Sequence, residues 1–197
     1  MFKAVIFDLN GVFIKSRKLS ERFEEKFGVK QEEFLPALNA IMPKVRMPDA
    51  GDAFSYWKPY FDKWGLDLSK EAFFDFWFSG EKEAPEMISL ARELKDRGVK
   101  LFILSNNVIE RTKFYNNNFP FLKELFEKVY YSWQTGFTKS NAGAYQKLLE
   151  ENNLKPEECV FFDDSPGNVA VANGLGIKSY LFESAEKTRE ILNPPKN

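Results

Sequence analysis

Short apolar runs alternate with helical patterns along much of the chain. Five apolar runs are spaced along it, at residues 3–7, 100–105, 128–132, 159–164 and, more weakly, 178–182. Continuous runs of this length are typical of strands buried on both faces of a sheet. Apolar residues at helical spacing lie between them, at residues 84–98, 141–153 and 166–174. From about residue 84 onward, this alternation predicts a parallel α/β sheet with right-handed helical crossovers.

Residues 16–83 break this alternation. The segment is long, helical in pattern and rich in Phe, Trp and Tyr, as in "FSYWKPYFDKWG" and "SKEAFFDFWFSG". Its aromatic residues suit the core of a small helical bundle, and a substrate pocket lined by aromatic residues is the alternative. Because the segment directly follows the first strand, it would lie over the edge where α/β sheets bind ligands. We therefore expect a core made of residues 1–15 and 84–197, with residues 16–83 as a helical cap.

The first apolar run ends in "FDLNG", which has two interpretations. Asn-Gly between apolar runs is a strong signal for a β-hairpin, since both residues tolerate positive φ. Alternatively, the run ends at Asp8 because Asp8 has a chemical role at the end of a buried strand.

Composition narrows the chemistry that this chain can perform. The 197 residues are 44% hydrophobic and 29% charged, with a net charge of −1, and they contain one Cys and no His. The balanced charge gives no general attraction to nucleic acid or to anionic membranes. Without His, Ser-His-Asp catalysis and His-bound zinc are excluded, so a metal would be a hard ion held by oxygen, such as Mg²⁺. We expect a cytoplasmic protein, either a monomer or a weak homodimer.

Polar residues follow three of the predicted strands. Asp8 ends the first run, Ser105 and Asn106 end the second, and Asp163 and Asp164 end the run at 159–164. The carboxyl ends of parallel strands share one edge of a sheet, so these side chains can converge. Carboxylates brought together repel unless a cation compensates them, and Mg²⁺ would do so.

A lysine in a loop would complete such a site. Lys139 lies in "GFTKSNAGAY", just before the helix that leads to the run at 159–164. It is either an ordinary solvated loop residue or a cation that restrains Asp8 and binds an anionic substrate.

Four motifs together resemble those of the haloacid dehalogenase superfamily. They are "VIFDLNG", "FILSNN", "GFTKSNAGAY" and "VFFDDSPGNVAVANGLG", in that order. The segment between the first two resembles the helical cap of the subclass that includes small sugar-phosphate phosphatases. The resemblance implies a Rossmann-like fold and a phosphatase that acts on a small phosphorylated substrate.

The resemblance also implies a role for each motif. Asp8 would be the nucleophile that forms an aspartyl-phosphate, and Ser105 with the amide of Asn106 would bind the phosphoryl oxygens. Lys139 would stabilise Asp8 and the developing charge. The resemblance further implies these Mg²⁺ ligands: Asp8, the backbone carbonyl of Asn10, Asp164, and Asp163 directly or through water.

Asn10 departs from the family pattern, which has a second Asp two residues after the nucleophile. An amide neither gives nor takes a proton at neutral pH. General acid–base catalysis is worth about 10²–10⁴ in rate, so a slower enzyme would follow. Three alternatives are open: an enzyme that uses solvent or substrate as proton source, a non-catalytic protein that binds a phosphorylated ligand or protein partner, and an engineered Asp→Asn change. Other chemistry of the superfamily is a further option; dehalogenases also lack the second Asp, but the Asp163–Asp164 pair favours a metal.

The cap would supply substrate specificity. Its candidates for contact with the rest of an anionic substrate are Lys44, Arg46, Trp57 and Lys58. The alternative for each is an ordinary role in the surface or core of the bundle.

Overall fold

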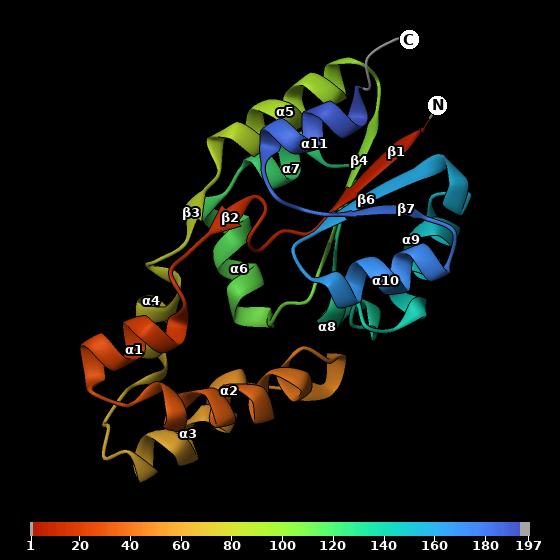
Figure 1. Ribbon diagram of the computed structural model, residues 1–197. Helices are drawn as coiled ribbons and strands as arrows, with labels where there is room; N and C mark the ends of the chain where they lie inside the picture. The colour runs from red at the N-terminus through yellow and green to blue at the C-terminus, as the bar shows by residue number, and fades with distance from the viewer. Residues whose placement is uncertain (1, 194–197) are drawn as a thin grey trace.

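The computed structural model describes residues 2–193 and contains a parallel sheet with five strands (Figure 1). The strand order is β5-β4-β1-β6-β7. The strands are β1 (Ala4–Phe7), β4 (Lys100–Ser105), β5 (Lys128–Tyr131), β6 (Cys159–Asp163) and β7 (Lys178–Leu181). The central strand β1 is buried on both faces, as its continuous apolar run predicts. The predicted Rossmann-like α/β core is therefore confirmed.

Helices cover both faces of the sheet. The helices on one face are α5 (Pro85–Asp96), α6 (Ile109–Asn118), α7 (Phe121–Leu125) and α11 (Ala185–Leu192). The helices on the other are α9 (Ala142–Glu151) and α10 (Pro166–Gly174). Two short elements, α8 (Ser132–Thr135) and η2 (Pro156–Glu158), lie in the connections. The three helices expected between strands are present as α5, α9 and α10, whereas α6, α7, α8 and α11 were not predicted.

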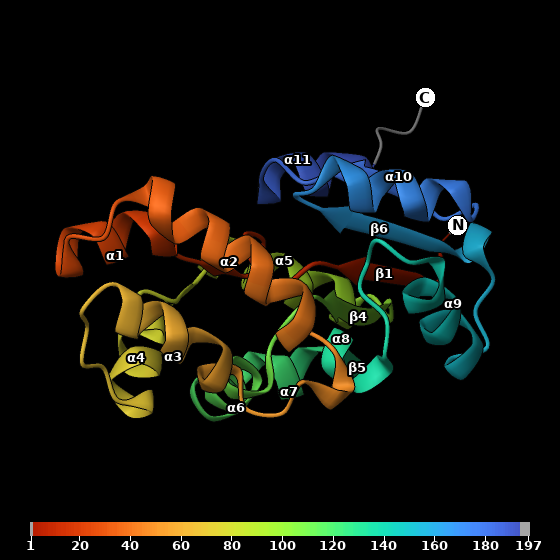
Figure 2. The ribbon, with the colours of Figure 1, turned by 90° about the horizontal axis from the view of Figure 1, so that it is seen from below.

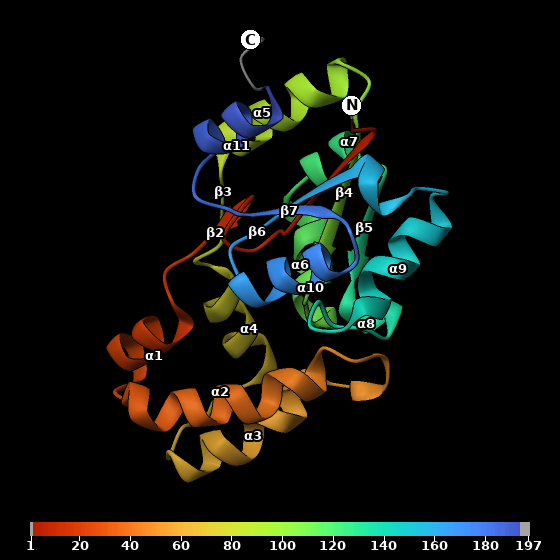
Figure 3. The same cartoon turned by 45° about the vertical axis from the view of Figure 1, so that its right-hand side comes forward.

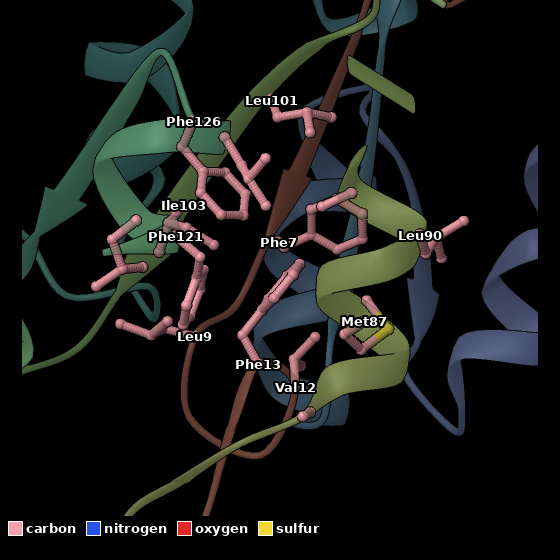
Figure 4. Close-up of a cluster of buried hydrophobic side chains, with 14 of the residues drawn as sticks. Phe7, Leu9, Val12, Phe13, Met87, Leu90, Leu101, Ile103, Phe121 and Phe126 are labelled. Atoms are coloured by element: carbon pink, nitrogen blue, oxygen red, sulfur yellow. The ribbon is translucent and has the colours of Figure 1, made fainter. Parts of the chain in front are cut away.

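The core on the first face surrounds the end of β1 (Figure 4). Phe7 packs edge-on against Phe13, with ring centroids 5.3 Å apart, and stacks with Phe162 of β6. Met87 and Leu90 of α5 lie on the same cluster. This packing fixes the backbone on both sides of residues 8–11, where the candidate site begins.

Two short strands separate the sheet from the helical segment. β2 (Ile14–Lys15) pairs antiparallel with β3 (Lys82–Glu83), so the chain leaves the core and returns to it at adjacent points. The hairpin interpretation of "FDLNG" is wrong, because β1 pairs in parallel with β4 and β6. Asn10 and Gly11 instead begin the turn that leads from β1 to β2.

The segment between β2 and β3 is helical (Figures 2 and 3). Its elements are α1 (Leu19–Phe27), α2 (Gln31–Val45), η1 (Pro48–Ala50), α3 (Ala53–Lys63) and α4 (Lys70–Phe78). Their aromatic side chains form a second buried cluster, in which Trp57 and Phe73 have ring centroids 5.3 Å apart. The contacts of the segment with the core include α4 on α6 and η1 on α8. Val108, in the loop after β4, is buried in the cluster of the helical segment.

Within residues 2–193, none of the helices combines the length and the apolar character that crossing a membrane requires.

Candidate active site

Three carboxylates meet at the carboxyl ends of β1 and β6. Phe7 and Phe162 are register partners on these neighbouring parallel strands, so the residues that follow them lie at the same level. The Asp8 amide donates to the Phe162 carbonyl at 2.8 Å. Oxygen atoms of Asp8, Asp163 and Asp164 all lie within 4.8 Å of one another. The convergence predicted for these strand ends is therefore present.

Lys139 joins two of these carboxylates. Its Nζ lies 2.6 Å from Asp8 Oδ1 and 2.6 Å from Asp163 Oδ2, and its side chain is only 3% exposed. The Asn106 side chain accepts a hydrogen bond from the Lys139 amide at 2.9 Å, and Tyr145 donates to the Lys139 carbonyl. Lys139 is thus a buried charge held by both its side chain and its backbone, and the alternative of a solvated loop lysine is wrong.

Asp163 and Asp164 differ in their surroundings. Asp163 is fully buried, and its Oδ1 accepts hydrogen bonds from the Ser165 amide at 2.8 Å and from Asn168 Nδ2 at 3.0 Å. Asp164 is exposed, and within residues 2–193 no side-chain hydrogen bond or ion pair engages its carboxylate. The Asp164 carboxylate is therefore available to a ligand, whereas Asp163 already holds Lys139 and the start of α10.

The Asn10–Gly11 turn approaches Asp164 closely. Gly11 has φ +86°, and a Cβ on it would lie 2.3 Å from Asp164 Oδ2. Glycine is needed here both for the left-handed backbone and for the close approach. The turn therefore brings the backbone of Asn10 to the edge of the carboxylate cluster.

Burial among like charges changes the acidity of Asp8. Desolvation raises the pKa of Asp8 to about 6, with Lys139 opposing the rise and Asp163 adding to it. Without a cation besides Lys139, part of the Asp8 population would be protonated near pH 6. Added positive charge at this edge would favour the ionised, nucleophilic form.

These carboxylates suit a hard divalent cation. Carboxylate and carbonyl oxygens are the ligands that Mg²⁺ prefers in proteins, and the exposed Asp164 lies next to the buried pair. The donor set therefore fits Mg²⁺, with Asp8 and Asp164 as the carboxylates least engaged by the protein.

Ser105 and Asn106 lie beside this cluster at the end of β4. Ser105 is the last residue of β4 and is buried, with its Oγ 3.4 Å from Asn10 Nδ2. The Asn106 side chain positions the Lys139 loop, which leaves its backbone amide as the group for a ligand. The two residues are thus brought next to Asn10 and Lys139, as predicted.

Asn10 also contacts a row of polar side chains at the end of its amide that faces away from Ser105. Sequence reasoning missed this row. The Tyr115 hydroxyl lies 2.6 Å from Asn10 Oδ1 and 2.7 Å from Glu81 Oε2. Arg111 forms an ion pair with Glu81 at 2.6 Å, and its guanidinium lies 5.3 Å from the centre of the Tyr115 ring. Arg111 and Tyr115 are one turn apart on α6, a helix that the apolar pattern did not reveal.

The four candidates of the helical segment occupy different environments. Trp57 is fully buried in the aromatic cluster, so it belongs to the core of the segment. Lys44 is exposed, and Lys58 pairs with Asp62 on the exposed face of α3. Arg46 is the C-cap residue that follows α2, and its Nε is buried without a hydrogen-bond partner among residues 2–193. Burial and the nearby Arg111 lower the pKa of Arg46, and the charge of Asp8 opposes this shift.

The family model for haloacid dehalogenase-like hydrolases matches residues 2–176. Among curated proteins, the chain is 28% identical over 106 residues to phosphatase MT3486 of Mycobacterium tuberculosis, a match that covers 54% of this chain and 49% of that protein. It is 24% identical over 208 residues to bifunctional epoxide hydrolase 2 of Sus scrofa, covering 93% of this chain and 37% of that protein. The chain thus spans about half the length, or less, of these curated relatives.

A solved structure has the same fold. It is a HAD family enzyme, bt-2542, from Bacteroides thetaiotaomicron, in complex with magnesium and inorganic phosphate. The TM-score is 0.80 at 22% identity, with 98% of this chain and 100% of that chain covered. At this identity the likeness establishes the fold.

Proposed function

Because the chain belongs to the haloacid dehalogenase-like hydrolases, we propose that it is a Mg²⁺-dependent phosphatase of small phosphorylated metabolites, with Asp8 as nucleophile. The observation that carries this proposal is the buried contact of Asp8 with Lys139 beside Asp163 and Asp164. Phosphatases among the curated relatives support the reaction class.

Each residue of the cluster has a role in this reaction. Asp8 attacks phosphorus, so that an Asp8 oxygen–phosphorus bond forms and the ester oxygen leaves; water then cleaves the aspartyl-phosphate and releases inorganic phosphate. Ser105 and the Asn106 amide bind phosphoryl oxygens. Lys139, already 2.6 Å from Asp8, offsets the negative charge on the nucleophile and on the phosphoryl group.

Mg²⁺ would be held by Asp8, Asp164 and the backbone carbonyl of Asn10, with Asp163 direct or through water. When bound, the ion would supply positive charge that neutralises the transferring phosphoryl group. The chain's own contribution is the arrangement: Lys139 and the start of α10 hold Asp163, and the Gly11 turn leaves space for the Asp164 carboxylate.

Because residue 10 is Asn, it supplies no side-chain acid to protonate the leaving group. The departing oxygen would therefore take its proton from solvent or from the substrate, or depart as a stable anion. This predicts faster turnover of esters with good leaving groups.

We further propose that residues 16–83 act as a cap and that Arg46 is its contact to the rest of the substrate. Among the four sequence candidates, Arg46 is the one whose buried Nε has no hydrogen-bond partner within residues 2–193 and whose charge interacts with that of Asp8. An unpaired guanidinium there favours a substrate with an anionic or acceptor-rich leaving group.

Steady-state hydrolysis of 4-nitrophenyl phosphate tests the proposal. The native chain should turn it over with Mg²⁺ and lose activity in a chelator, and Asp8→Ala should be inactive in both. An Asp8→Ala variant with the full rate would overturn the assignment of the nucleophile.

The second candidate is a protein that binds a phosphorylated ligand or partner without turnover, which Asn10 favours. A native chain that binds inorganic phosphate with Mg²⁺ but hydrolyses no aryl phosphate would support it.

A further inference from the structure

The Asn10 side chain is connected to the helical segment by a buried row of polar groups. The row runs from Asn10 through Tyr115 to Glu81, with contacts of 2.6 and 2.7 Å, and ends at Arg111. The side chain of Glu81 is 1% exposed, and Tyr115 is fully buried. Glu81 lies between α4 and β3, so the row joins the end of the helical segment to the turn after the nucleophile.

The number of available hydrogens determines which group donates and which accepts in each contact of this row. Tyr115 has one hydroxyl hydrogen and two oxygen neighbours. Glu81 is the stronger acceptor, because it carries the charge that pairs with Arg111, so the Tyr115 hydrogen points to Glu81. The Tyr115 oxygen then needs a donor from Asn10. In the structure Asn10 Oδ1 faces the Tyr115 hydroxyl and Asn10 Nδ2 lies 3.4 Å from Ser105 Oγ, which leaves the contact between Asn10 and Tyr115 without a hydrogen. A half-turn of the carboxamide exchanges its two ends, so that its nitrogen donates to Tyr115 and its oxygen faces the hydroxyl of Ser105.

A carboxylate at position 10 has no hydrogen to offer. It would share one hydroxyl hydrogen with Glu81. It would also place a second negative charge on a buried site where Glu81 already pairs with the Arg111 guanidinium. An unprotonated Asp is therefore poorly accommodated in these surroundings, whereas Asn satisfies every contact in the row.

We propose that Tyr115 and Glu81 are positioning residues that hold the Asn10 carboxamide with its oxygen toward Ser105, and that they select Asn over Asp at position 10. The oxygen of Asn10 is then a fixed hydrogen-bond acceptor next to the phosphoryl site, and the surrounding side chains require an amide at this position. The effect on turnover rests on the proposed phosphatase function; the selection of Asn does not.

The first test is kinetic. Tyr115→Phe removes the hydroxyl and should lower kcat for 4-nitrophenyl phosphate about 10-fold with KM unchanged, since one hydrogen bond is worth about a factor of ten. The matched control is Tyr130→Phe, because Tyr130 is equally buried but its hydroxyl contacts Glu151 and Asn152 away from the site. It should retain the native kcat. A Tyr115→Phe variant with the native kcat, or an equal loss in both variants, overturns the positioning role.

The second test is a thermal double-mutant cycle that needs no turnover. Asn10→Asp should lower the melting temperature and bring no gain in rate, and so should Glu81→Gln, which leaves Arg111 unpaired. The double variant restores the charge balance, so its melting temperature should fall by less than the sum of the single effects. Additive effects, or an Asn10→Asp variant that is both faster and more stable than the native chain, would overturn the selection of Asn. If no variant shows Asp8-dependent hydrolysis, the phosphatase proposal fails. The double-mutant cycle still tests the selection of Asn at position 10, because it measures melting temperatures.

Discussion

Lys139 holds Asp8 by a direct ion pair, with Nζ 2.6 Å from Oδ1 and both side chains less than 10% exposed. Its second contact, to Asp163, has the same length. One cation thus offsets two buried carboxylates, and its removal leaves both without their partner.

We expect Lys139→Met to abolish hydrolysis and to lower the free energy of unfolding by about 3–5 kcal/mol, the usual cost of breaking a buried pair. Urea denaturation measures the stability. The control Lys113→Met changes an exposed lysine of α6 and should leave both activity and stability near native values. A stable, active Lys139→Met variant would contradict the role of this ion pair.

Asp163 and Asp164 should respond differently to loss of charge. Asp164 is exposed, so Asp164→Asn should weaken Mg²⁺ activation about 10- to 100-fold with little effect on folding. Asp163→Asn should instead lower the melting temperature, because Lys139, Ser165 and Asn168 all bind this carboxylate. Titration of activity with Mg²⁺, together with thermal melting in chelator, separates the two. Equal behaviour of both variants would argue against the division of roles.

The stability of the metal-free protein should depend on pH through Asp8. Its pKa rises from 3.8 to about 6 on folding, so the folded chain binds the proton more tightly than the unfolded chain does. The resulting stability is fully present below pH 3.8 and is lost as the pH rises through about 6; its limit is about 3 kcal/mol.

The measurement is the difference in melting temperature between the native chain and Asp8→Asn in chelator. As the pH falls from about 8 to about 5, the melting temperature of the native chain should rise relative to that of the variant. A constant difference across this range would show that Asp8 keeps its ordinary pKa.

Arg46 should affect binding of the leaving group. Arg46→Ala should raise KM about 10-fold for a phosphate ester with a carboxylate on its leaving group, since hydrogen bonds to charged groups are worth about 1.5–3 kcal/mol. An ester with a neutral leaving group should be affected less. Lys44→Ala, which alters an exposed lysine of the same helix, is the control. Equal KM changes for both esters would exclude Arg46 as the contact.

Sequence reasoning predicted the part of the site that follows strands. Asp8, Ser105 and Asp163 end apolar runs, and strand order alone brings such ends to one edge. It did not predict the row beyond Asn10. Glu81 and Tyr115 are 34 residues apart and stand in no motif, and their contact depends on how α6 packs beside the linker. The weak apolar periodicity of α6, which buries only Thr112 and Tyr115, explains why this helix was not predicted.

The antiparallel pairing of β2 with β3 has an evolutionary consequence. The helical segment leaves and rejoins the core at adjacent residues, Ile14 opposite Glu83 and Lys15 opposite Lys82. An insertion anchored in this way can be exchanged or reshaped without moving the strands that carry Asp8 and Asp163. Glu81 should stay with the core, because it reaches from the anchor to Tyr115. A chimaera that receives a foreign helical segment would therefore keep its chemistry if the junction is placed before Glu81.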